Sequence, residues 1–254
     1  MVKKHSNDIK YNVEKPLQHL KVTFRIIFGN YKLFLPLILV ALGLYVLTMG
    51  ASGDTFMLMM VLAVLTLWLA SLLIIRHIVA GKELNFRDAL YNAMTPLVPT
   101  LLVLVVLFAE CIPIFLLIIG YSTAVEVNLF GNVFYGSVFV LVALLLVAVS
   151  AYFVSNSLMG LIAVSTPGTY PVEALILSSE MMKGKRLRLI LRLFMMILVL
   201  GVIGAVILLP LVFVDAAVEF SIMPMVVFIV GCFAVIYAAV YLYIYYRWIL
   251  DEGK

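Results

Sequence analysis

Charged side chains are scarce in this sequence. They make up 12% of its 254 residues, against a hydrophobic share of 66%. A soluble domain of this length needs a far larger polar fraction to cover its core. Several apolar runs exceed 18 residues, the length that indicates a membrane-spanning helix. The composition therefore excludes an ordinary soluble protein and predicts an all-α, polytopic membrane protein.

Cysteine and histidine are also rare, with two and three residues respectively. Cys111 and Cys232 both fall inside apolar runs, which indicates buried small side chains rather than a disulfide framework or a metal site. The sequence contains no HExxH, CxxC or glycine-rich phosphate loop. We therefore expect no enzyme activity, no catalytic residue, no metal and no cofactor. The first thirty residues lack an apolar core, so we expect no cleaved signal peptide.

The apolar runs predict six transmembrane helices. Their expected ranges are 33–50, 56–79, 97–119, 136–164, 189–213 and 223–246. Each range can cross a hydrocarbon layer about 30 Å thick at 1.5 Å per residue. The fourth is longer than needed, and Ser155, Asn156, Ser157 and Gly160 predict a kink or an early exit near its end.

The basic residues fall on one side of this arrangement. All 17 precede the first span, follow the last, or lie in or beside the connections between spans two and three and between spans four and five, with Arg76 and Arg192 just inside span ends. The opposite loops carry acidic residues and no lysine or arginine: Asp54, Glu126, Asp215 and Glu219. Since positive charge resists translocation, we expect both termini in the cytoplasm of a cell with this protein in its plasma membrane, most simply a bacterium.

Three cytoplasmic segments have the pattern of amphipathic interfacial helices. The segments are 16–31, 85–97 and 171–185, and each precedes a predicted pair of spans. The sequence thus predicts three repeats of a surface helix followed by a transmembrane hairpin. The expected domains are a cytoplasmic N-terminal segment with an interfacial helix (1–32), a six-helix transmembrane domain (33–247) and a cytoplasmic tail (248–254).

A group of five cations lies between the fourth and fifth spans. Lys185, Arg188 and Arg192 are spaced to share one helix face. There they can reach lipid phosphates while their aliphatic stems stay in the apolar layer. We predict an anionic lipid headgroup site; a specific anionic ligand is the alternative. A nucleic-acid partner is not expected, because no soluble aromatic-rich module accompanies the cations.

Few polar residues lie within the spans. Glu110 is the single acid inside a predicted span, and Pro113 follows it closely. An acid at this depth marks either a proton or cation site, or a carboxyl group bonded to a neighbouring helix. Ser155, Asn156 and Ser157 form a second polar group, for which interhelical hydrogen bonds are the commoner role.

Two further patterns concern the last two spans. The tyrosines near the end of the sixth span, with Trp248, indicate an interfacial aromatic belt. Gly201 and Ala205, four residues apart, predict close approach of a neighbouring helix.

The segment EALILSSEMMKGKRLRLILRL, which leads into the fifth span, and the terminal YYRWILDEGK give the chain a family resemblance. It resembles the membrane domain of glycerophosphoryl diester phosphodiesterases and related six-span bacterial proteins. In that family a soluble catalytic barrel with a His-Arg-Gly-type motif can follow the membrane domain. Here the histidines stand in KHSN, QHLK and RHIV, so no catalytic residue carries over.

These observations leave competing functions open. The first is a non-catalytic protein that organises membrane or lipid, or serves as an accessory or scaffold subunit for a membrane partner. The second is a small transporter or export component with Glu110 in a polar intramembrane site. An intramembrane lipid enzyme built from dispersed residues is the third.

Overall fold

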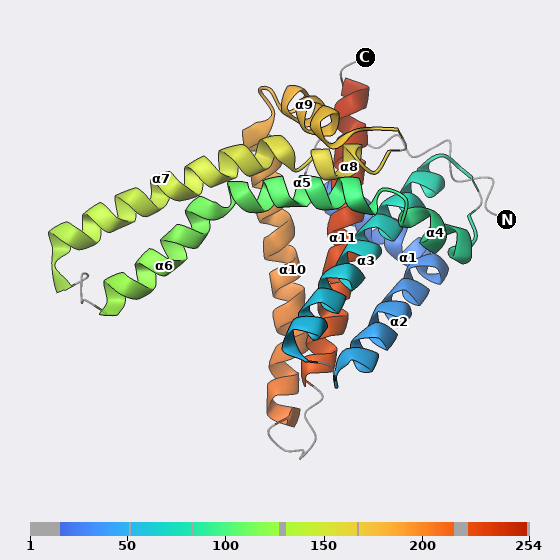
Figure 1. Ribbon diagram of the computed structural model, residues 1–254, viewed down its shortest axis with the longest axis horizontal. Coiled ribbons are helices and arrows are strands. Elements are labelled where there is room, and N and C mark those ends of the chain that lie inside the picture. Colours follow the sequence, from blue (N-terminus) through green and yellow to red (C-terminus); the bar gives the residue numbers. More distant parts are fainter. Residues whose placement is uncertain are drawn as a thin grey trace. The chain divides into compact units, whose positions relative to one another are not determined.

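The computed structural model describes residues 16–50, 52–82, 84–126, 131–166, 168–215 and 223–252. Within these ranges the chain forms helices and no strand. In chain order they are α1 (Pro16–Gly29), α2 (Tyr31–Thr48), α3 (Gly53–Val79), α4 (Phe86–Ala93), α5 (Leu97–Glu110), α6 (Ile112–Glu126), α7 (Val133–Ser157), α8 (Gly160–Ala163), α9 (Pro171–Met181), α10 (Arg186–Asp215) and α11 (Met223–Glu252). The predicted fold class is confirmed: this is an all-α polytopic membrane protein (Figure 1).

Five stretches of helix are long and apolar enough to span a membrane. They are Tyr31–Thr48, Gly53–Val79, Val133–Ala163, Arg186–Val212 and Met223–Glu252. Helices α4 and α5 meet the same criterion together but are bent by 59°, so a count of six requires that this bent pair be one span.

The third predicted span, 97–119, is not one helix. Helix α5 ends at Glu110 and α6 begins at Ile112. Pro113 has no backbone N–H to continue the helical ladder, and the N–H groups of Ile114 and Phe115 both donate to the carbonyl of Cys111. This local rearrangement breaks the helix beside the buried acid. Near the end of the fourth predicted span, α7 ends at Ser157 before the short α8, although Val133–Ala163 as a whole still meets the criterion for one span.

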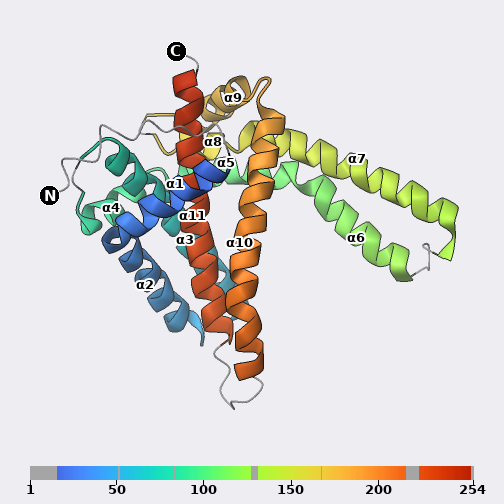
Figure 2. The same ribbon diagram turned by 180° about the vertical axis from the view of Figure 1, so that it is seen from behind.

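The chain divides into two compact units, each of which we describe by itself. The first comprises residues 1–97 and 191–254, and the second residues 98–190. In the first unit α3 contacts α2, α4 and α11, and α1 lies against α11 (Figure 2). Its core is formed by apolar side chains of α3 and α11, among them Leu72, Ile74, Ile236 and Val240.

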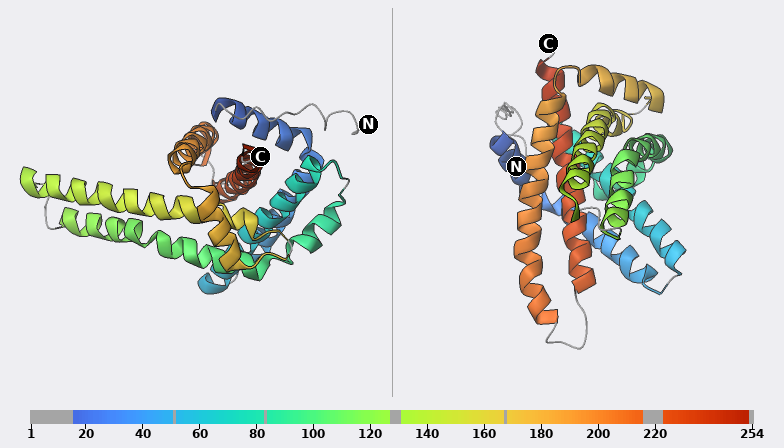
Figure 3. Two further views of the ribbon diagram at one scale, coloured as in Figure 1. Left: turned by 90° about the horizontal axis from the view of Figure 1, so that it is seen from above. Right: turned by 90° about the vertical axis from the view of Figure 1, so that its left-hand side faces the viewer.

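Helices α10 and α11 lie side by side (Figure 3). A Cβ atom at Gly204 of α10 would lie 3.9 Å from the Val230 side chain of α11. Gly201 and Ala205, by contrast, are both exposed. The predicted contact of these two residues with a neighbouring helix is therefore wrong within this chain, and Gly204 takes that place.

In the second unit α6 and α7 pair along their lengths, and α9 packs on α7 and α8. Gly160 makes this junction possible. A Cβ atom there would meet the Leu175 side chain at 3.3 Å and the Ala174 carbonyl oxygen at 3.5 Å. The bare backbone at Gly160 therefore lets α9 approach closely.

The three predicted surface segments all form helices: α1, α4 and α9. In the element order each precedes two long helical segments, as the repeat requires. The apolar face predicted for 85–97 is the one that packs, whereas the apolar faces predicted for 16–31 and 171–185 are buried only in part. Helix α4 buries Ala89 and Ala93, and α9 buries Ala174 and Ser178. Helix α1 buries His19 and Thr23 with its aliphatic residues, while Leu17 and Phe28 are exposed.

Candidate functional site

Glu110 stands at the break between α5 and α6, within the second unit. Its carboxyl oxygen Oε1 accepts a hydrogen bond of 2.5 Å from Ser157, at the end of α7. Its backbone carbonyl accepts a 2.6 Å bond from the hydroxyl of Ser150, also on α7. At the helix break the Glu110 carbonyl loses its partner within the helix, and Ser150 of α7 donates to it instead. The predicted interhelical bonding is confirmed for Ser157.

Asn156 occupies the same end of α7. The hydroxyl of Ser178 on α9 donates to its backbone carbonyl. The last four carbonyls of a helix lack partners within the helix, so this bond caps the end of α7. It also joins α9 to the helix that contacts Glu110.

Ser155 does not belong to this group. Its hydroxyl donates to the carbonyl of Tyr152, one turn earlier in the same helix, at 2.8 Å. The polar group therefore comprises Glu110, Ser150, Asn156, Ser157 and Ser178. The sequence singled out three of these residues and missed Ser150 and Ser178, because the topology that brings α5, α7 and α9 together has no local sequence signal.

Two oxygen atoms of this group are buried and have no hydrogen-bond donor among the described residues. They are Oε2 of Glu110 and Oδ1 of Asn156. Each unsatisfied buried oxygen costs about 1–3 kcal/mol. Both residues are half-buried as a whole, although these two oxygen atoms are buried.

The predicted headgroup cations Lys185, Arg188 and Arg192 are not equivalent. Gly184, with φ of 73°, turns the chain from α9 into α10, and Lys185 is half-buried beside this turn. Arg188 is exposed, whereas Arg192, one turn further, is only 2% exposed. The prediction of one face of three surface cations is therefore wrong for Arg192.

Arg192 lies among aromatic rings in the first unit. Its guanidinium carbon is 4.8 Å from the centre of the Tyr245 ring and 4.7 Å from that of Trp248. The hydroxyl of Tyr241 donates to its backbone carbonyl at 3.3 Å. Cation–π contacts of this kind offset part of the cost of burying the charge. Arg192 thus joins α10 to α11 instead of reaching lipid phosphates.

His19 of α1 completes this buried group, which the sequence did not indicate. It is fully buried, and its ring stacks on Tyr241 with centroids 3.8 Å apart. Burial, together with the positive charge of Arg192, lowers the pKa of His19 to about 3. The backbone of Tyr241 raises this pKa by a smaller amount, although neither ring nitrogen of His19 has a hydrogen-bond partner among the described residues. The imidazole is therefore neutral at physiological pH.

The predicted aromatic belt is wrong for three tyrosines of α11. Tyr237, Tyr241 and Tyr245 are completely buried, four residues apart along one face. That face packs against α1, where the hydroxyl of Tyr237 donates to the carbonyl of Leu20 at 3.3 Å. These rings form core contacts and do not line a membrane boundary.

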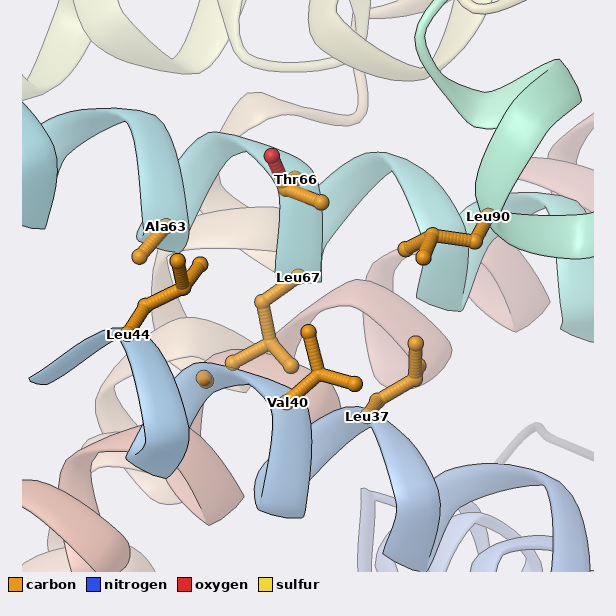
Figure 4. Close-up of a pocket in the computed structure, with 8 residues that line it drawn as sticks. Leu37, Val40, Leu44, Ala63, Thr66, Leu67 and Leu90 are labelled. Atoms are coloured by element: carbon orange, nitrogen blue, oxygen red, sulfur yellow. The ribbon is translucent and has the colours of Figure 1, made fainter. Parts of the chain in front are cut away.

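An apolar pocket lies between α2 and α3, with Leu90 of α4 at one end (Figure 4). Its lining is aliphatic except for Thr66. The Thr66 hydroxyl already donates to the Leu62 carbonyl at 2.7 Å. The pocket therefore offers no charge to orient a polar substrate. Across the described parts of the chain, no group of three His, Cys, Asp or Glu side chains is placed to hold a metal ion.

Comparison with known proteins does not assign the chain to a group. No protein-family model matches it, and no match was found among curated proteins or among solved structures. The resemblance to the phosphodiesterase membrane domain therefore stays a prediction.

Proposed function

We propose that this protein is a non-catalytic integral membrane protein that organises lipid at the cytoplasmic face of a bacterial plasma membrane. The observation that carries the proposal is the orientation of α4 and α9. Helix α9 buries alanine and serine and leaves large apolar residues outside, and α4 buries two alanines and exposes one large ring, that of Tyr91. Tyr91 of α4 is 80% exposed, and Val172 of α9 is 67% exposed.

Lipid explains this arrangement physically. Membrane helices pack through small residues, because large apolar side chains are equally well solvated by acyl chains. A short helix that exposes apolar residues beside cations is suited to the boundary between acyl chains and headgroups. Exposed cations accompany each of the three short helices: Lys21 and Arg25 on α1, Arg87 on α4, and Lys183 just after α9. Anionic headgroups attract such cations by about 1 kcal/mol each.

The same arrangement suits an accessory or scaffold subunit that holds a membrane partner beside a chosen lipid. The resemblance to a phosphodiesterase membrane domain agrees with this role. Anionic lipid and a second membrane protein are the partners that we propose.

Spin labels test the proposed lipid contact. Single cysteines replacing Tyr91 and Val172 are labelled in vesicles, in a background with Cys111 and Cys232 replaced by alanine. We expect both labels to be more accessible to oxygen, which concentrates in lipid, than to a water-soluble nickel reagent. Labels at Lys82 and Lys183, both exposed in connections between helices, are the controls and should show the reverse. If all four labels prefer the water-soluble reagent, the short helices do not enter lipid and the proposal fails.

Orientation has a separate test. Cysteines at Ser52 and at Lys82 lie in connections at opposite ends of α3. In intact cells, a membrane-impermeant maleimide should label position 52 and spare position 82. The opposite pattern would place the basic side outside and contradict the proposed cytoplasmic termini.

Transport is the second candidate function, and one observation favours it. Glu110 lies at a broken helix with its oxygen Oε2 buried and lacking a donor among the described residues. Acids at membrane depth commonly mark ion or proton pathways. A proton or solute flux in proteoliposomes that Glu110→Gln abolishes would support this candidate. A flux unchanged by that substitution would remove Glu110 from any coupling role.

A further inference from the structure

The polar group around Glu110 has an excess of hydrogen-bond acceptors. A serine hydroxyl carries one donor and two acceptor lone pairs. Here the hydroxyl protons of Ser150, Ser157 and Ser178 are all directed at oxygens of Glu110 or Asn156. Apart from the amide nitrogen of Asn156, the group then presents oxygen lone pairs alone.

Two of the acceptors lack donors, as described above: Oε2 of Glu110 and Oδ1 of Asn156. Ser157, which binds the other carboxyl oxygen, directly follows Asn156 at the end of α7. The Glu110–Ser157 bond therefore ties the carboxyl group, with its orphan oxygen Oε2, to the end of α7. Carboxylate and amide oxygens are the ligands preferred by hard cations.

The neighbours of Glu110 do not supply a compensating charge. The adjacent titratable group is the thiol of Cys111, and α7 presents the neutral groups of Ser150, Asn156 and Ser157. From α9, Ser178 is also neutral. The cation at the start of α10, Arg186, lies over the Tyr152 ring at 4.2 Å. A water molecule could satisfy an oxygen, but it would leave a carboxylate charge uncompensated at membrane depth, which is costly.

We propose that the carboxyl group of Glu110, held in place by Ser157, binds a monovalent cation, either a proton or a sodium ion, at Oε2. Ser150 and Ser178 are positioning residues, because they hold the broken end of α5 and the end of α7 in place. The break at Pro113 is what brings the carboxyl group to this point. The site does not depend on the proposed lipid function, and it supplies the intramembrane site that transport would need.

The test measures thermal unfolding of the full-length protein in nanodiscs. One series varies sodium at a constant total of sodium and choline chloride, at mildly alkaline pH. The other varies pH without sodium. Each is run on the wild type, on Glu110→Gln, and on Glu126→Gln, which makes the same chemical change at an exposed position of α6. At each condition the unfolding midpoint of Glu110→Gln is subtracted from that of the wild type. Because His19 is present in both proteins, the subtraction removes its contribution.

A bound sodium ion should raise this difference by about 3 °C or more between sodium-free and saturating conditions. A bound proton should instead raise it as the pH falls, without any effect of sodium. Glu126→Gln should behave as the wild type in both series. A difference that is flat in sodium and in pH would overturn the proposal, because Glu110 would then bind neither ion more tightly in the folded protein than in the unfolded chain.

A second measurement covers the case in which Glu110→Gln does not fold. The maleimide reactivity of Cys111, half-buried next to Glu110, is followed in the wild type with Cys232 replaced by alanine. The labelling rate of Cys111 should change over the same range of sodium concentration or pH as the unfolding midpoint does. Ser157→Ala, which keeps the carboxyl group, should shift those concentrations several-fold. The site would also be overturned if the labelling rate of Cys111 did not respond to sodium in either the wild type or Ser157→Ala, and had the same pH dependence in both. Binding without ion flux in proteoliposomes would retain the site and reject transport.

Discussion

The ring of His19 stacks on the ring of Tyr241 at a centroid distance of 3.8 Å and an angle of 17°. This contact attaches α1, the first described helix, to α11, the last. Tyr241 in turn donates to the backbone of Arg192 on α10. One tyrosine therefore connects three helices that are distant in the sequence, and it does so through neutral and aromatic groups in a region that excludes water.

Substituting His19 should change how stability depends on pH. Its pKa is about 3 in the folded protein and near 6.5 when unfolded, so the unfolded chain binds the proton first as the pH falls. Stability should decrease from about pH 6.5 towards 3, with a limiting slope of about 1.4 kcal/mol per pH unit, and be independent of His19 above that range. His19→Phe keeps a stacking ring and should flatten this slope in chemical unfolding curves.

The control for this prediction is His77→Phe in α3. His77 is half-buried and bonds to the Leu73 carbonyl of its own helix. We expect that variant to retain the wild-type slope. A slope unchanged in His19→Phe would mean that His19 is not buried as a neutral ring.

Arg192→Lys should destabilise the protein although it preserves the charge. An ammonium group cannot lie flat against the rings of Tyr245 and Trp248 as a guanidinium does. The loss should be about 2 kcal/mol, the strength of a desolvated cation–π contact. Arg188→Lys, on the exposed part of the same helix, should cost less than about 0.5 kcal/mol. Equal losses in the two variants would contradict the buried position of Arg192.

Two adjacent serines of α9 should respond differently to alanine. Ser178 is fully buried and bonds to the carbonyl of Asn156 on α7, whereas Ser179 bonds to Ile176 within its own helix. Ser178→Ala should lower the free energy of unfolding by about 1 kcal/mol, and Ser179→Ala should leave it nearly unchanged. Thermal unfolding in detergent would measure both. A larger loss for Ser179→Ala would indicate that α9 packs through its other face.

Glycine substitutions distinguish a tight helix junction from an open one. Gly160→Val forces methyl groups against Leu175 and the Ala174 carbonyl, and should cost about 1–3 kcal/mol. Gly201→Ala meets nothing within 4 Å and should be neutral or slightly stabilising, because alanine favours helix more than glycine does. Should Gly201→Ala prove the more harmful of the two, Gly201 would contact something outside this chain.

The sequence alone determined the five described stretches that are long and apolar enough to cross a membrane. A span needs about twenty consecutive apolar residues to cross the hydrocarbon layer, and each such stretch can be recognised from its own sequence. The three short amphipathic helices and the end of α7 at Ser157 follow from equally local signals. The break after Glu110 did not follow from a local signal. Pro113 can kink a helix, end it or leave it intact, depending on which group donates to the backbone carbonyls that lose their helical partner.

The tertiary structure decided which of several similar residues is buried against a neighbouring helix. Arg188 and Arg192 occupy the same helix face, yet one is exposed and the other lies between aromatic rings. Ser178 and Ser179, and Gly201 and Gly204, differ in the same way. In a membrane chain the apolar pattern marks the residues that leave water and does not distinguish lipid from protein as their surroundings. That choice depends on which helix lies alongside.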